Sequence, residues 1–148
     1  MDYAATRYAA YKEASVNTAS PLKLVVMLYE GAIRFLRQSI EAIHTKDLAA
    51  KRESINRAVA IVQHLQSTLD FSQGEEISKE LDTLYTYTME QILLGSARLD
   101  EKNLYEAIKI LSTLLSAWDD AARKESENGV PPELLIQNSG RPGLQLHG

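Results

Sequence analysis

Three short polar links divide most of this chain into four segments in which apolar residues recur every three or four positions. The links lie near residues 44–47, 71–75 and 99–103, and no strand pattern competes with the helical one. Links this short force consecutive helices to lie side by side and antiparallel. We therefore predict an all-α fold, an antiparallel up-down-up-down four-helix bundle. The expected helices span about 21–44, 48–69, 75–99 and 103–124.

The ends of these segments carry signals that start helices. Ser20-Pro21 is typical of an N-cap followed by proline at the first helical position. Asp47 is the expected cap of the second helix. Ser72 and Glu75 have the spacing of a capping box before the third helix, and residues 103–106 repeat that spacing before the fourth.

The first helix has more apolar surface than one buried face requires. From Leu22 to Tyr29 only Lys23 is polar, so apolar side chains extend nearly all the way round for two turns. Residues 58–62 of the second segment are similarly apolar. Another part of this chain or another protein must cover the second face.

The domain organisation follows from length and composition. The chain has 148 residues, enough for one domain with a hydrophobic core. We expect a single bundle domain over 1–124, in which residues 1–19 form a short helical or extended cap. Residues 125–148 are rich in glycine, proline and polar residues, which predicts a flexible, disordered tail.

Composition also narrows the class of protein. The net charge of −4 argues against broad affinity for nucleic acid. The absence of cysteine removes disulfides and thiolate metal sites. The N-terminus lacks a secretory signal pattern, and no apolar run reaches transmembrane length. We expect a cytoplasmic protein without membrane insertion.

The chain lacks the complete set of residues for two kinds of chemistry that occur in helical bundles. A di-metal carboxylate site needs Glu-x-x-His on two helices. Glu41 and His44 match this pattern once, whereas neither His64 nor His147 follows a glutamate at that spacing. A phosphotransfer role for His64 lacks a basic group in the residues that follow it. We predict a binding protein that is not an enzyme and has no cofactor or metal. The alternative is a structural module that uses its extra apolar faces to form a homodimer.

Five motifs, in this order and spacing, make the chain similar to the flagellin-specific export chaperone family, FliS. The resemblance covers roughly residues 8 to 122, and the first motif is the most specific. The motifs are Ser15-Val16-Asn17-Thr18-Ala19-Ser20-Pro21, Met27-Leu28-Tyr29-Glu30-Gly31-Ala32, Ile61-Val62-Gln63-His64-Leu65, Leu84-Tyr85-Thr86-Tyr87 and Ala117-Trp118.

The resemblance implies a client, the C-terminal segment of flagellin, which is disordered when free and largely helical when bound. It implies that the chaperone prevents premature polymerisation and delivers flagellin to the flagellar type III export apparatus. Tyr8 and Tyr11 would belong to a removable lid over the client groove and would contact the export gate after displacement. A co-chaperone or a flagellar regulator is a further partner that the resemblance leaves open.

Candidate residues are assigned to a core set and a groove set, and Val62 belongs to both. Tyr85 and Tyr87 fit either role, and Tyr87 is the better candidate for client contact because it lies off the main apolar stripe. The expected core set is Leu28, Phe35, Val62, Leu65, Leu84, Leu111 and Trp118. The expected flagellin groove is Leu22, Leu24, Met27, Ile55, Ala58, Val59, Ile61, Val62 and Tyr87.

The chain also departs from the family pattern in charge. Glu90 and Gln91 stand where the family usually has basic residues after its Leu-Tyr-x-Tyr motif, and Asp119 replaces the basic residue common after the tryptophan. A partner surface on that side would have changed its sign.

Overall fold

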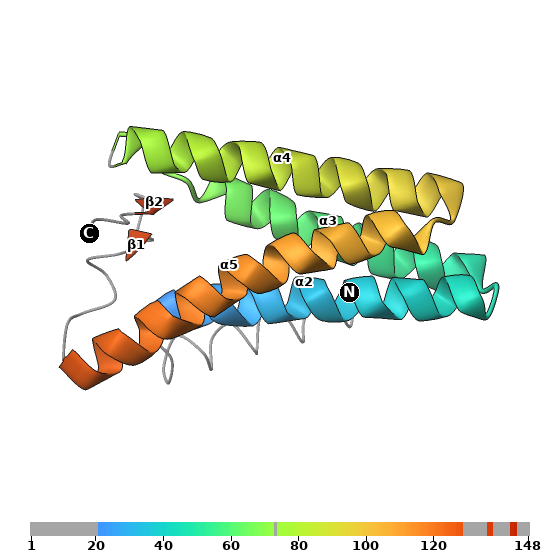
Figure 1. Ribbon diagram of the computed structural model, residues 1–148, viewed down its shortest axis with the longest axis horizontal. Coiled ribbons are helices and arrows are strands. Elements are labelled where there is room, and N and C mark those ends of the chain that lie inside the picture. Colours follow the sequence, from blue (N-terminus) through green and yellow to red (C-terminus); the bar gives the residue numbers. More distant parts are fainter. Residues whose placement is uncertain (1–20, 73, 129–135, 138–142, 145–148) are drawn as a thin grey trace, which may run out of the picture.

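Four long helices form the bundle in the computed structural model, which describes residues 21–72, 74–128, 136–137 and 143–144 (Figure 1). The predicted all-α four-helix bundle is confirmed. The segment containing Tyr8 and Tyr11 lies outside the described residues, as does most of the expected tail. The helices are α2 (Pro21–His44), α3 (Leu48–Ser67), α4 (Glu75–Arg98) and α5 (Glu101–Asn128).

Each helix packs against its neighbours in the chain, and α5 closes the bundle by packing against α2. In Figure 1 the orange α5 crosses the blue α2, while the green α3 and α4 lie beside each other. The last helix continues to Asn128, four residues beyond the expected end at Lys124. Two residue pairs of the expected tail, β1 (Ile136–Gln137) and β2 (Gly143–Leu144), form a short antiparallel ladder that the prediction did not include.

The start of α3 agrees with the sequence, the starts of α4 and α5 differ from it, and Ser20, the expected cap of α2, lies outside the described residues. Asp47 caps α3 as expected, because its Oδ1 accepts the N–H of Ala50 at 3.0 Å. The predicted capping box at Ser72 is wrong, because Gly74 is the N-cap residue of α4 and makes no side-chain cap bond. The reason is a competing acceptor, since the Asp70 carboxylate takes both the N–H and the hydroxyl of Ser72. The fourth helix starts two residues earlier than expected, and Asp100 accepts the N–H of Lys102 there.

Left-handed residues end α2 and α4. Lys46 has φ 60° and Leu99 has φ 53°, in the region that favours glycine. The N–H of Lys46 bonds the Ile43 carbonyl at 3.1 Å, and the N–H of Asp47 bonds the Ala42 carbonyl at 2.9 Å. These two bonds make the Schellman arrangement that satisfies the last carbonyls of a helix.

Replacing Lys46 with glycine is expected to raise the free energy of unfolding by up to about 1 kcal/mol, because glycine adopts this conformation without steric cost. Lys109 provides the control, since it is exposed in the middle of α5. Lys109→Gly is expected to lower the free energy of unfolding by about 1 kcal/mol. Urea unfolding followed by circular dichroism measures both. If the two variants shifted the midpoint in the same direction, the strain assigned to Lys46 would be absent.

The core lies along the inward stripes of all four helices. Tyr29, Leu36, Ile92, Leu104 and Leu111 are among its largest fully buried side chains. Burial of Val62, Leu65, Leu111 and Trp118 confirms those core predictions. Leu28 and Phe35 are half-buried and pack against the core from outside.

The prediction that Leu84 belongs to the core is wrong, because 37 % of its surface is exposed. The inward positions of α4 are Leu81, Tyr85, Thr88 and Ile92, spaced four, three and four residues apart. Leu84 comes one residue before Tyr85 and is therefore turned onto the flank of the helix.

Candidate binding surface

Four of the nine groove candidates lie in the core. Leu22, Ala58 and Val62 have no exposed surface, and Ile55 is 3 % exposed. Each belongs to the buried core cluster, which an apolar run does not reveal by itself. A bound segment would meet these four side chains only if the helices separated.

The other five candidates remain at the surface. Leu24, Met27, Val59 and Ile61 are half-buried, and Tyr87 is 40 % exposed. They lie on three helices: Leu24 and Met27 on α2, Val59 and Ile61 on α3, and Tyr87 on α4.

One part of the expected groove lies where α2 meets α3. The Ile61 Cδ1 atom lies 3.4 Å from the position that a Cβ on Gly31 would take, so Ile61 packs across onto the α2 backbone. One turn along, the guanidinium carbons of Arg34 and Arg57 lie 5.6 and 5.8 Å from the centre of the Phe35 ring. Phe35 is half-buried at this junction, with both cations over its ring.

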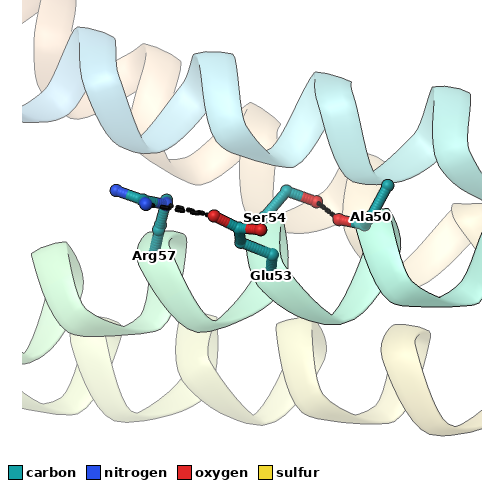
Figure 2. A network of polar contacts seen from close by, with 4 residues as sticks. All are labelled: Ala50, Glu53, Ser54 and Arg57. Atoms are coloured by element: carbon teal, nitrogen blue, oxygen red, sulfur yellow. Dashed lines mark hydrogen bonds and ion pairs between the residues drawn. The ribbon is translucent and has the colours of Figure 1, made fainter. Parts of the chain in front are cut away.

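The α3 side of this junction is held by local polar contacts (Figure 2). Arg57 donates to Glu53 Oε1 from Nη2 at 3.0 Å and from Nε at 3.3 Å. Ser54, which is buried, donates its hydroxyl to the Ala50 carbonyl one turn earlier at 2.9 Å. Arg57 is therefore fixed by its own helix while it lies over the Phe35 ring of α2.

A row of large, exposed apolar side chains lies along one face of α4. Leu84, Tyr87 and Leu94 are 37 %, 40 % and 37 % exposed, and their spacing of three and seven residues places them on one helix face. Gln91 lies on the same face and accepts a hydrogen bond from Asn103 of α5 at 2.9 Å, so this face borders α5. We call Leu84, Tyr87 and Leu94 the α4 stripe.

Sequence reasoning identified only Tyr87 of this stripe. Leu84 was assigned to the core, and Leu94 was assigned to no face. The signal that could have found them is a second apolar series on the same helix, offset by one position from the inward series. A shallow hollow of about 370 Å³ adjoins the stripe at Leu84 and is also lined by Lys79, Glu80 and Thr83.

A second hollow, of about 440 Å³, opens between α2 and α5. Ile33 of α2 and Leu115 of α5 supply its apolar floor. Its remaining lining residues come from α2: Glu30, Arg34, Arg37, Gln38 and Glu41.

Three aromatic side chains join α2, α4 and α5 inside the bundle. Trp118 Nε1 donates to the Tyr29 hydroxyl at 3.2 Å, and the hydroxyls of Tyr29 and Tyr85 lie 2.5 Å apart. Burial raises the pKa of Tyr29, and burial together with the neighbouring Tyr29 raises the pKa of Tyr85. Both phenols therefore stay protonated near neutral pH, and the network is a neutral, structural one. It also assigns Tyr85 to the core and leaves Tyr87 outside.

The histidine and acidic side chains of the described residues do not gather into a metal site. His44 pairs with Glu101 across the α2–α5 boundary and does not meet a second Glu-x-x-His pair. Within the described residues, no group of three or more histidine or acidic side chains could hold a metal ion. No described helix is both long and apolar enough to cross a membrane.

The fold and the α4 stripe define a class: a four-helix bundle that leaves a row of large apolar side chains exposed on one helix. Comparison with known proteins gives the family. The model of the family described as flagellar protein FliS matches residues 4–125. The chain belongs to the FliS family, which places it among the chaperones of flagellar export, a class that is generally not enzymatic.

Individual relatives agree over nearly their whole length. The flagellar secretion chaperone FliS of Vibrio cholerae is 35% identical over 139 residues, covering 91% of this chain and 96% of the relative. The protein of the same name from Bacillus subtilis is 31% identical over 121 residues, covering 82% and 90%. A crystal structure described as a flagellar chaperone from bacteria shares the fold with a TM-score of 0.66 at 20% identity, covering 80% of this chain and 99% of that one.

Proposed function

We propose that this protein is a cytoplasmic export chaperone whose client is the C-terminal segment of flagellin. It would prevent premature polymerisation of flagellin and deliver it to the flagellar type III export apparatus. Family membership supports the general role. The α4 stripe is the structural observation that carries the proposal of a helical client.

A helical client explains the stripe physically. An amphipathic helix presents its own apolar residues at spacings of three, four and seven, which match those of Leu84, Tyr87 and Leu94. Large apolar side chains gathered on one face mark binding sites, whereas single exposed ones need no explanation. Ordering a disordered client costs conformational entropy, so a long apolar contact is required to offset it.

Half-buried apolar residues also lie on other helices. Leu24 and Met27 lie on α2, and Val59 and Ile61 lie on α3, where Ile61 packs toward Gly31 of α2. An extended client that wraps the bundle would reach these positions as well as the α4 stripe. The proposed lid residues Tyr8 and Tyr11, their contact with an export gate component, and binding of a co-chaperone or regulator remain part of the same proposal.

Titration of a flagellin C-terminal segment into the folded protein by calorimetry tests the proposal. Tyr87→Ala is expected to weaken binding about tenfold, because it removes an aromatic contact from the centre of the stripe. Tyr105→Ala is the matched control, since Tyr105 is 47 % exposed and lies on α5 outside the stripe. It is expected to change affinity less than twofold, about the noise of such a comparison.

Two results would refute the proposal. One is no heat of binding at tens of micromolar with the bundle folded. The other is a concentration-dependent dimer in sedimentation that Tyr87→Ala abolishes, which would show that a second copy of the chain covers the stripe.

A further inference from the structure

The α4 stripe begins toward the end of the bundle at which the chain leaves its last helix. Because α4 and α5 are antiparallel neighbours, α5 ends at Asn128 on the side where α4 begins, and Leu84 is the stripe residue nearest to that end. Figure 1 shows the start of α4, the end of α5 and the β1–β2 ladder at this same end. The segment that follows α5 therefore leaves the bundle at the Leu84 end of the stripe.

The chain after Asn128 is long enough to reach the stripe. Gln91 of α4 bonds Asn103 of α5, which sets the register of the two helices and places Leu84 opposite about residue 110. From there to Asn128 the α5 axis is about 27 Å long, at 1.5 Å per residue. The segment from Asn128 to Ile136 spans up to about 28 Å when it is extended. Ile136 can therefore come level with Leu84, where the stripe starts.

The β1–β2 ladder needs an apolar surface to be stable. Its strands have two residues each, and a two-stranded ladder is marginally stable in water unless it packs against a helix or further strands. Ile136 pairs with Leu144, so two apolar residues stand opposite each other in the ladder. The side-chain charges of residues 129–148, one glutamate and one arginine, balance, so the acidic bundle does not repel this segment. The α4 stripe offers the apolar helix face that the ladder lacks.

We propose that β1 and β2 pack on the α4 stripe when no client is bound, with Ile136 and Leu144 against its apolar side chains. The stripe is exposed in the structure, so this packed arrangement is a second state of the molecule. The tether to α5 gives the ladder an effective concentration at the stripe on the order of 1 mM, at which a weak contact is populated. The client must then displace the ladder, and this consequence rests on the proposed function, whereas the contact itself does not.

A spin label tests the contact in the full-length protein without a client. The chain has no cysteine, so Ser139→Cys, between β1 and β2, gives a single site for a nitroxide. The label is expected to broaden the methyl NMR signals of Leu84 more than those of Leu93. Leu93 is the matched control, because it is exposed on the same helix but follows Thr86, which bonds Gln66 of α3, by seven residues and so lies on the α3 side. Equal broadening of the two leucines would overturn the inference. Broadening between a labelled and an unlabelled copy would also overturn it, since a second copy would then supply the contact.

Titration of the flagellin C-terminal segment tests the consequence. Ile136→Ser combined with Leu144→Ser removes the apolar pair and is expected to strengthen client binding about three- to tenfold, because the stripe is then free. Gln137→Ser combined with Gln145→Ser is the control one residue farther along the chain at each site, and is expected to change affinity less than about twofold. If the first variant bound the client no more tightly than the control, the inference would be overturned and client binding would stand. If neither the wild-type protein nor the variants bound the client, the proposed function would fail, and the methyl broadening would still show whether the ladder occupies the stripe.

Discussion

Replacing Trp118 with alanine is expected to lower the free energy of unfolding by about 3–5 kcal/mol. Trp118 is the chain's only tryptophan and is 4 % exposed. The substitution leaves a cavity between α5 and α2 and removes the N–H that donates to Tyr29. Small domains have a total stability of about 5–15 kcal/mol, so this loss would bring the bundle close to unfolding at body temperature.

The hydrogen bond and the volume of Trp118 can be separated. Tyr29→Phe keeps nearly all of the buried volume but leaves the Trp118 N–H and the Tyr85 hydroxyl without their shared partner. That change is expected to cost about 1–3 kcal/mol, the penalty for buried polar groups that lose a hydrogen bond. A larger loss for Trp118→Ala than for Tyr29→Phe would show that packing of the indole contributes more than the hydrogen bonds of the Tyr29 hydroxyl.

Urea unfolding followed by far-ultraviolet circular dichroism is the appropriate measurement, because Trp118→Ala removes the tryptophan fluorescence. Tyr87→Ala is the control, since Tyr87 is 40 % exposed and is proposed to bind the client. It should leave stability within about 0.5 kcal/mol of wild type while weakening client binding. If Trp118→Ala lowered the free energy of unfolding by less than about 1 kcal/mol, the hydrogen-bonded network of Tyr29, Tyr85 and Trp118 would not stabilise the core.

The fold was predictable from sequence because its information is local. Short links and apolar periodicity determine four antiparallel helices, and the start of α3 depends on the residue next to it, Asp47. The prediction that Ser72 starts a capping box was wrong for an equally local reason. Asp70 lies two residues earlier and takes the hydroxyl that the capping box requires.

The binding surface was predictable only in part because it depends on rotation of each helix about its axis. On α4 a period of 3.6 residues allows an inward series through Leu84 or through Tyr85, and the spacing alone does not choose. Tyr85 finds the Tyr29 hydroxyl in the core, whereas Leu84 has no such partner. On α2 the apolar run gave no way to separate Leu22, which is fully buried, from Leu24, which is half-buried.

Replacing Gly95 with alanine is expected to lower the free energy of unfolding by about 2 kcal/mol or more, although alanine is the better helix former by about 1 kcal/mol. A Cβ at Gly95 would lie 2.8 Å from Leu104 Cγ, 2.9 Å from Leu104 Cδ2 and 3.0 Å from the Asp100 carbonyl oxygen. Leu104 is fully buried, and the Gly95 carbonyl accepts the N–H of Asp100 at the end of α4. The missing side chain of Gly95 therefore allows Leu104 and the Asp100 carbonyl to approach closely, and neither neighbour has room to move.

Gly31→Ala supplies the matched control, because it is the same substitution in a helix with more space. Its Cβ would lie 3.4 Å from Ile61 Cδ1 and 3.7 Å from Arg34 Nη2, both ends of flexible side chains. That variant is expected to be neutral or more stable by up to about 1 kcal/mol in urea unfolding. Combining Gly95→Ala with Leu104→Ala should cost less than the sum of the two changes, since the smaller side chain removes the contact that the new methyl group makes. If Gly95→Ala instead raised the unfolding midpoint as Gly31→Ala does, the junction between α4 and α5 would be able to open, and glycine would not be required there.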